Sequence, residues 1–175
     1  MKIAKNIRVD AEFTIDELSV IYTLVKESKE SLPESEEDGY PDYYGEYIEP
    51  ASKRVIASIL KKISKYLPKE KTNGIDKDFL RTKYHTFNNN INQKVYGILK
   101  RAFDQLKTVE IEYFNMESAE FKKRMVDIYY TSAKYTIGYC HLRKDIRKFR
   151  TSRIASAKLT NAGYTVPKRF DKNDW

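Results

Sequence analysis

Hydrophobic residues in the first part of the chain recur at three- and four-residue intervals, which is typical of amphipathic helices. Thr14 and Glu17 fit a capping box, and the apolar stripe that follows predicts a helix over about 14–31. A second stripe predicts a helix that Pro50 opens and that ends at Leu67. A polar, lysine-rich connection is expected to run from there to about residue 80. A third stripe comprises Ile91, Val95, Ile98, Leu99, Ala102 and Leu106.

From Thr108 onward the period changes to two. Val109, Ile111 and Tyr113 alternate with Glu110 and Glu112, as in a half-buried strand. The pattern predicts strands over 108–114, 120–129, 134–141, 146–151 and 154–160. Five short strands joined by tight turns favour a small, strongly bent β-barrel, because closure removes exposed sheet edges. The fold class is therefore α+β, with about three helices followed by a five-stranded barrel.

This pattern divides the chain into three parts. Residues 1–107 form a helical linker and dimerisation region, 108–162 the barrel and 163–175 a C-terminal tail. The first part contains an acidic loop over 33–50, in which seven acids and four tyrosines occur without Lys or Arg between Glu34 and Glu49. A solvated connection is favoured there over a segment that mimics a nucleic-acid backbone.

Charge is distributed unevenly along the chain. Residues 1–119 hold 19 Lys and Arg against 20 Asp and Glu, whereas residues 120–175 hold 14 against 5. The last third therefore carries a net charge of +9 by these counts. Such clustering favours an anionic partner for this part of the chain.

Enzymatic and metal-binding patterns are not apparent. The sequence has no glycine-rich phosphate loop, and His85 and His141 lack nearby ligands for a metal. Cys140 is the single cysteine, and a buried thiol is favoured over a nucleophile. We expect no catalytic activity, no metal and no cofactor. No apolar run reaches the length of a membrane span, and no secretory signal is seen, so the cytoplasm is the expected location.

The densest chemical signal lies between Arg143 and Arg153, where six basic residues accompany one acid. Four of the six are arginines, whose planar donor groups suit phosphates. Rings interleave with them, as in sequence-tolerant single-strand binders. Strand alternation places Arg147, Phe149 and Thr151 on one face and Ile146, Lys148 and Arg150 on the other. The rings Tyr139 and Phe149, together with Ile137, fit the barrel core equally well.

Four segments resemble the WYL domain family, and the likeness covers roughly residues 95–160. Two lie in the basic region: Tyr139-Cys140-His141-Leu142-Arg143 and Arg147-Lys148-Phe149-Arg150-Thr151-Ser152-Arg153-Ile154. The other two resemble the family's first and second strands: Val109-Glu110-Ile111-Glu112-Tyr113 and Arg124-Met125-Val126-Asp127. The family's Trp-Tyr-Leu falls on Lys134-Tyr135-Thr136, and Ile128 replaces its usual proline. The resemblance implies an Sm-like barrel within ligand-sensing transcriptional regulators. It leaves open whether this is a stand-alone protein or a fragment of a longer regulator, since no winged helix-turn-helix precedes Phe13.

The leading hypothesis is a regulatory module that binds single-stranded DNA or RNA, or a nucleotide-like ligand, through one anion site. Its predicted residues are Tyr135, His141, Arg143, Arg147, Phe149, Arg150 and Arg153. One alternative is a small-molecule sensor that controls a transcription regulator, and another is a structural oligomerisation element. Expected protein partners are a second copy of the chain, as a homodimer, and a DNA-binding regulator or CRISPR effector. No membrane contact is expected.

Overall fold

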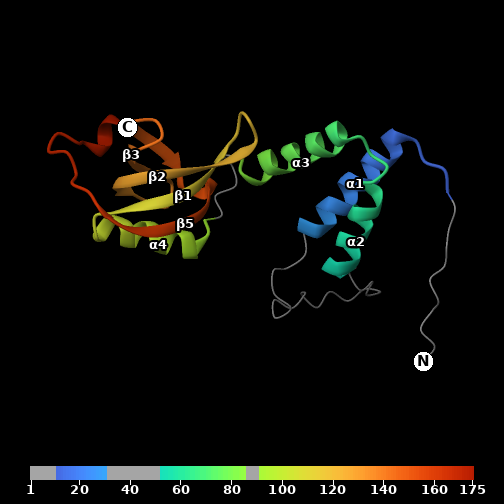
Figure 1. Ribbon diagram of the computed structural model, residues 1–175, viewed down its shortest axis with the longest axis horizontal. Coiled ribbons are helices and arrows are strands. Elements are labelled where there is room, and N and C mark those ends of the chain that lie inside the picture. Colours follow the sequence, from blue (N-terminus) through green and yellow to red (C-terminus); the bar gives the residue numbers. More distant parts are fainter. Residues whose placement is uncertain (1–10, 31–51, 86–90) are drawn as a thin grey trace, which may run out of the picture. The chain divides into compact units, whose positions relative to one another are not determined.

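The computed structural model describes residues 11–30, 52–85 and 91–175, which form four α-helices and one antiparallel sheet (Figure 1). The helices are α1 (Ile15–Glu30), α2 (Lys53–Ile63), α3 (Lys69–Lys83) and α4 (Gln93–Asp104). The strands are β1 (Lys107–Asn115), β2 (Glu120–Thr131), β3 (Tyr135–Cys140), β4 (Asp145–Arg150) and β5 (Ile154–Gly163). The α+β class is confirmed. The predicted acidic loop lies outside the described residues.

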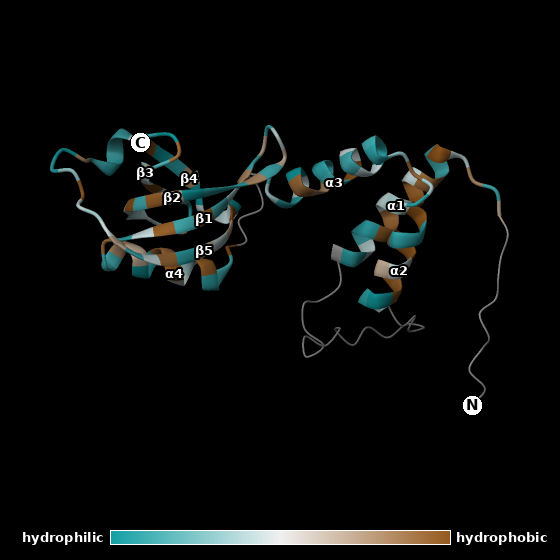
Figure 2. Cartoon of the chain, in the orientation of Figure 1, coloured by the Kyte–Doolittle hydropathy of each residue, from teal (hydrophilic) through white to brown (hydrophobic). Residues whose placement is uncertain are grey.

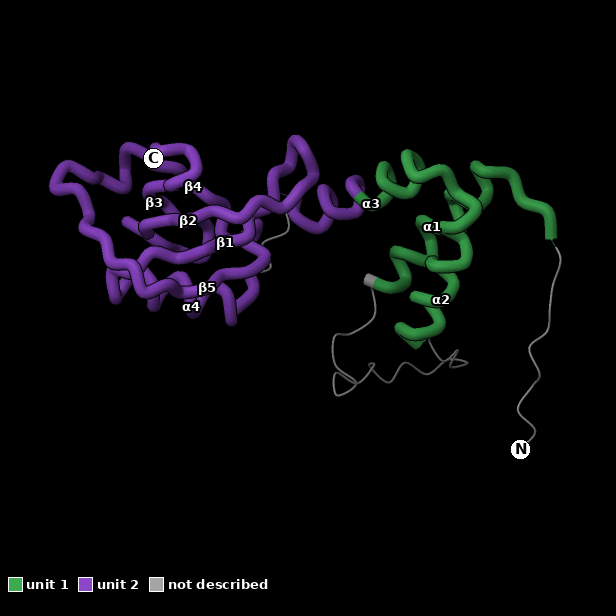
Figure 3. The backbone as a smooth tube through the Cα atoms, in the orientation of Figure 1, with its two compact units in different colours: residues 1–76 green, residues 77–175 purple. Residues whose placement is uncertain are grey.

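The chain divides into two compact units, residues 1–76 and residues 77–175 (Figure 3). In the first unit, α1 begins with the predicted capping box. The main-chain N–H of Glu17 donates to Thr14 Oγ1 at 3.2 Å, and the N–H of Thr14 donates to Glu17 Oε2 at 2.7 Å. These bonds to Thr14, the main-chain one above all, lower the pKa of Glu17. Ser52 caps α2 in a similar way by accepting from the N–H of Val55.

Helix α3 corrects the prediction of a polar connection up to residue 80. Its apolar residues are confined to Ile75, Phe79 and Leu80, which are half-buried, so its hydrophobic pattern gave only a weak signal. Polar contacts hold each half of it within its own unit. Asp76 accepts from Lys26 and from the hydroxyl of Tyr22, whereas Arg81 donates to the main-chain oxygens of Met116 and Glu117. The structure therefore has four helices in its described residues, and the predicted three are one too few.

The five strands follow the order β4-β3-β2-β1-β5, and every neighbouring pair is antiparallel. The predicted strands are confirmed to within three residues at each end. The sheet is not closed, which corrects the predicted barrel: among the described strands, β4 pairs with β3 alone and β5 with β1 alone. The bend is supplied by register shifts in β1–β5 and β2–β3, and α4 covers one face in place of closure.

Helix α4 packs against β1, β2 and β5, and we call the sheet face that contains this core the inner face. Figure 2 shows hydrophobic positions alternating with hydrophilic ones along these strands. The core is formed by three α4 residues and by apolar side chains of the strands. They are Val95, Leu99 and Ala102 with Val109, Ile111, Val126, Ile128, Cys140, Phe149 and Ile154. Asn92 caps α4 by accepting from the N–H groups of Lys94 and Val95.

Residues 164–175 lie along the opposite face of the sheet, which we call the outer face. The hydroxyl of Tyr164 donates to the main-chain oxygen of Ile128, and the Phe170 ring packs against the Tyr129 ring with centroids 5.2 Å apart. Lys148 donates to a main-chain oxygen of Trp175. The predicted tail is therefore attached to the sheet, and it helps to bury Ile137 on the face opposite α4.

Candidate anion-binding interface

The basic segment folds into the β3–β4 hairpin at one edge of the sheet. Between residues 134 and 153, seven cations accompany a single acid, Asp145. We call them the hairpin cations: Lys134, Arg143, Lys144, Arg147, Lys148, Arg150 and Arg153. The strand register pairs Tyr135 with Arg150 and Gly138 with Arg147. Residues directly opposite one another share a face, so Arg150 lies on the outer face and Arg147 on the inner face.

On the inner face, Arg147 is exposed and its Nη2 lies 3.5 Å from Asp145 Oδ2. Phe149, two residues along, is only 4% exposed and belongs to the core. Its ring meets the Tyr113 ring edge to face, with centroids 5.1 Å apart. Phe149 therefore supports the hairpin from within, and the structure offers no exposed face of this ring to a ligand.

On the outer face, Tyr135 is half-buried, and two lysine ammonium groups lie over its ring. Lys148 Nζ lies 4.4 Å from its ring centroid and Lys134 Nζ lies 5.4 Å from it. Arg150 is the direct neighbour of Tyr135 across the strand pair, and its main-chain N–H donates to the hydroxyl of Tyr113. Lysines held over a tyrosine ring keep their charge available to an anion while their stems are ordered.

The remaining two predicted arginines lie at opposite ends of the hairpin. Arg143 is exposed in the tight turn between β3 and β4, where Lys144 has a positive φ of 53° and its N–H donates to the Cys140 oxygen. Arg153 follows β4 and donates through Nε to the main-chain oxygen of Tyr84 at 3.2 Å. Arg153 thus fastens the hairpin to the segment after α3, while Arg143 projects from the turn.

His141 is joined to a carboxylate that sequence reasoning missed. Its Nε2 lies 3.0 Å from Oδ1 of Asp127, a buried residue that also accepts from the Thr108 hydroxyl at 2.6 Å. Asp127 stands opposite Tyr139 in the β2–β3 register, and the Tyr139 ring contacts the imidazole edge to face. Knowledge of that register would have revealed the pair, because the hairpin brings residues 127 and 141 together. Asp127 holds the imidazole in one place at the end of the hairpin.

The charge of Asp127 also acts on two nearby tyrosines. Burial, reinforced by the negative charge of Asp127, raises the pKa of Tyr164 well above its ordinary value. The same two causes, in the same order, raise the pKa of Tyr129. Both phenols therefore stay neutral and serve as hydrogen-bonding and packing groups beneath the 164–175 segment.

Arg124 is a second residue that sequence reasoning missed. It is 9% exposed on the inner face, where it lies opposite Ile111, and its Nη1 approaches the Cys140 sulfur at 3.8 Å. Its Nε is a buried donor with no partner in the described part of the chain. The predicted burial of the Cys140 thiol is confirmed. An arginine within the apolar row of β2 gave no motif by which sequence alone could have identified it.

The structure thus brings the predicted site residues together in smaller groups. Tyr135 and Arg150 share the outer face, Arg147 and Phe149 share the inner face, and His141 and Arg143 lie near the hairpin turn. Over residues 11–30, 52–85 and 91–175, no group of three His, Cys, Asp or Glu side chains is suited to hold a metal. Within the same ranges, no helix is long and apolar enough to cross a bilayer.

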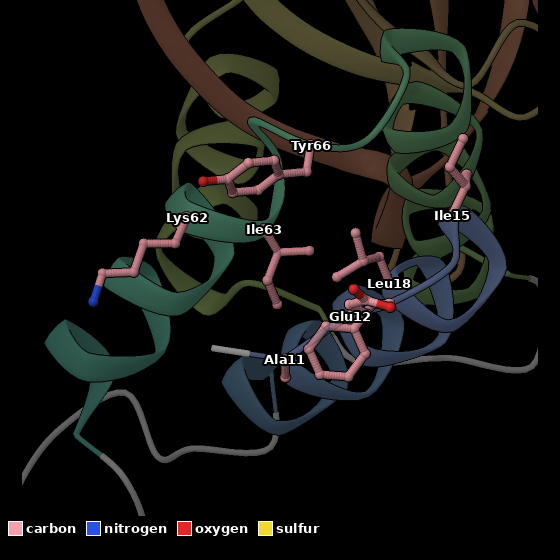
Figure 4. A pocket seen from close by; sticks show the side chains of 8 residues that line it. Ala11, Glu12, Ile15, Leu18, Lys62, Ile63 and Tyr66 are labelled. Carbon is pink, nitrogen blue, oxygen red and sulfur yellow. The ribbon is translucent and has the colours of Figure 1, made fainter. Parts of the chain in front are cut away.

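The helical unit carries a separate apolar groove of about 740 Å³ between α1 and α2. Figure 4 shows Leu18 of α1 and Ile63 of α2 pointing toward each other across it, with Tyr66 at one end and Lys62 directed away. Within the described part of this unit, the buried apolar side chains are Tyr22, Ile56 and Leu67. Phe13, Ile15, Val20, Leu24, Val55 and Tyr66 are exposed. The groove contains no cluster of cations and is unrelated in chemistry to the hairpin.

Comparison with known proteins bears on the second unit. The family model described as WYL domain matches residues 94–159. Among solved structures, proteasome accessory factor B/C of Arthrobacter aurescens is similar at 16% identity and a TM-score of 0.36. That alignment covers 87% of this chain and 21% of the other, so this chain spans about a fifth of that protein's length. No curated protein matches the sequence.

The family match begins at the start of α4 and ends within β5. It therefore includes the inner-face core, the β3–β4 hairpin and the Asp127–His141 pair. It supports the coarse part of the expected function, a domain of the regulatory, ligand-sensing type. The resemblance indicated by the sequence is confirmed to the extent that the WYL domain model matches residues 94–159 of this chain.

Proposed function

We propose that the β3–β4 hairpin binds single-stranded nucleic acid, or a nucleotide-like anionic ligand, and that this binding serves transcriptional regulation. The observation that carries the proposal is the composition of an edge hairpin: seven cations against one acid, on both faces and in the turn. An edge strand with cations on both faces can contact successive phosphates of a flexible strand, whereas a rigid duplex meets one face at a time.

Each group on the hairpin has a role in this proposal. Arg143, Arg147 and Arg150 contact phosphates, and Tyr135 orders Lys134 and Lys148 over its ring on the outer face. Asp127 fixes the His141 ring near the hairpin turn, where the ring can contact the strand. Phe149 and Arg153 act indirectly, because the first fills the core and the second holds the main-chain oxygen of Tyr84. No catalytic step is proposed, and Cys140, the single thiol, is buried.

The test is a fluorescence-polarisation titration with a labelled single strand of about twenty nucleotides and with its duplex. The affinity should fall steeply between about 50 and about 200 mM salt. In a plot of the logarithm of affinity against the logarithm of salt concentration, each phosphate contacted should add about 0.7 to the steepness of the slope. Arg147→Gln should weaken strand binding and lower that slope. Lys158→Gln, which removes the same charge from an exposed position on β5 at the other edge, is the matched control.

Either of two results would contradict the proposal. One is the absence of single-strand binding at the lower salt concentration. The other is an equal loss of affinity in Arg147→Gln and Lys158→Gln, which would reduce the interaction to the overall charge of the chain. A preference for duplex over single strand would shift the proposal to another class of nucleic-acid binding.

The helical unit is proposed as the dimerisation region, and the cytoplasm as the location. The exposed apolar side chains of α1 and α2 favour a homodimer, since a patch of this kind is normally covered. Light scattering on the wild type and on Leu24→Glu tests the proposed dimer, which the variant should weaken. A monomeric wild type would contradict it. A DNA-binding regulator or CRISPR effector is the proposed further partner.

A further inference from the structure

A cavity of about 390 Å³ opens on the outer face between the hairpin and residues 172–175. Three lysines, Lys134, Lys148 and Lys172, line it together with three aromatic rings. The rings belong to Tyr130, Tyr135 and Trp175. Among the described residues that line it, there is no carboxylate side chain. Lys148 already donates to an oxygen of Trp175, and the three ammonium groups together still give the cavity an excess of positive charge that an anion can offset.

The rings hold the three ammonium groups in place. Lys134 and Lys148 both lie over Tyr135, and Lys172 lies over Tyr130 with its Nζ 5.3 Å from the centroid. Lys148 also donates to the main-chain oxygen of Trp175. A phosphate that enters the cavity would compete with this oxygen for Lys148. Binding would therefore change the surroundings of Trp175.

The β2–β3 turn, which carries lining residues of the cavity, is fixed by hydrogen bonds. The hydroxyls of Thr131, Thr136 and Thr151 form a chain with separations of 3.0 and 3.2 Å, and Thr151 donates to the main-chain oxygen of Ser132 at 2.9 Å. The Ser132 hydroxyl accepts from the N–H of Tyr135 at 3.1 Å. These bonds fix the β2–β3 turn, and with it the positions of two of the lining side chains, before any ligand arrives.

We propose that this cavity is a second site, which shares Lys134 and Lys148 with the hairpin and takes a small aromatic anion, of which a nucleoside monophosphate is the simplest example. The lysines, held over the two tyrosine rings, supply point charges for one phosphate, and Trp175 supplies stacking surface for a base. The volume is near the lower end of the roughly 300–1,000 Å³ common for ligand pockets, which suits a single nucleotide. The inference goes beyond strand binding by the hairpin, because Lys172 and Trp175 lie outside the hairpin.

The protein contains its own reporter for this site. Trp175 is the single tryptophan of the sequence and lines the cavity, so its emission should change as the ligand enters. The experiment titrates the full chain with adenosine monophosphate, adenosine and inorganic phosphate, and follows tryptophan emission and heat. We expect the monophosphate to bind more tightly than either fragment alone. Emission and heat unchanged up to about 1 mM monophosphate would overturn the proposal, as would adenosine binding equally well.

Variants assign the binding to the cavity. Lys172→Gln should weaken monophosphate binding by about tenfold, and Lys134→Gln gives an independent check from the β2–β3 turn. Lys168→Gln, an exposed lysine of the same C-terminal segment that does not line the cavity, is the matched control. Thermal melting monitors folding of each variant. Equal affinity in Lys172→Gln, Lys134→Gln and wild type would overturn the proposal.

Strand titrations with the same variants separate the two sites. Lys172→Gln should bind the single strand as the wild type does, because residue 172 lies outside the hairpin. Loss of strand binding in Lys172→Gln would overturn the separation of the sites. A protein that binds the monophosphate but no strand would refute the hairpin proposal and leave the cavity proposal standing.

Discussion

Gly138 of β3 lies directly against the main-chain carbonyl of Asp127 on β2. A Cβ atom at Gly138 would stand 2.9 Å from the carbonyl carbon of Asp127, closer still to its oxygen, and 3.0 Å from Cα of Ile128. The obstacle is main chain, which cannot turn aside as a flexible side chain would. The glycine is required by space and not by backbone conformation, since its φ is not positive.

Gly138→Ala should therefore destabilise the sheet by about 1–3 kcal/mol or more, because the new methyl group forces β2 and β3 apart. Gly97→Ala is the matched control, since a Cβ there meets nothing within 4 Å in an exposed turn of α4. That change should stabilise the protein by about 0.5–1 kcal/mol. Urea unfolding measures both, and an unchanged midpoint for Gly138→Ala would contradict the close approach.

Phe149→Ala should cost about 3–5 kcal/mol of unfolding free energy, because the ring is buried against Tyr113 in the core. Phe149→Leu keeps most of the apolar volume and should retain the fold. Strand affinity of the leucine variant should then match the wild type. A folded Phe149→Leu protein with strongly reduced strand affinity would show that the ring meets the ligand after all.

Substitutions of Arg153 and Arg147 should distinguish a role in stability from a role in binding. Arg153→Gln loses the bond to the Tyr84 oxygen and should lower the unfolding free energy by about 1 kcal/mol. Arg147→Gln loses an exposed ion pair with Asp145 and should change stability by less than about 0.5 kcal/mol. Chemical denaturation of both variants checks this order. The reverse order would mean that the inner-face cation, and not Arg153, fastens the hairpin.

Alkaline pH should destabilise the sheet through Tyr164. Its folded pKa is raised above the ordinary value of 10.0, so its contribution to stability is fully present below pH 10. The contribution is lost as pH rises through the folded pKa, because unfolding then releases the proton. Between about pH 9 and pH 11, the melting temperature should fall less steeply with pH for Tyr164→Phe than for the wild type. Parallel curves would contradict the assignment to Tyr164.

Local signals in the sequence foretold much of the fold. The Thr14–Glu17 box marked the start of α1, and alternation around Ile111 marked the strands and the opposite orientations of Arg147 and Lys148. The helix α3 was not predicted because Asn73-Gly74 is typical of a turn and only Ile75, Phe79 and Leu80 supply apolar contacts along it. Polar contacts such as that of Asp76 with Lys26, which lie far apart in sequence, also hold it.

The candidate site was less predictable, because its geometry depends on strand register and on the path of the chain after β5. Alternation alone placed Phe149 beside Arg147, yet it could not decide between core and ligand contact. The partnership of His141 with Asp127 requires the β2–β3 register, which includes an irregularity after Ile128. The lysine cavity depends on Lys172, and no pattern in the sequence indicated that the last residues return to the sheet.

The open edge of β4 has a consequence for the behaviour of the free protein in solution. An unpaired strand can add a second copy of itself, and charged side chains along it are a common protection against such aggregation. On β4, Arg147 and Lys148 would meet like charges if two edges approached. The charge that attracts a polyanion therefore also keeps molecules apart, and saturation with short oligonucleotides should lower the solubility of the protein.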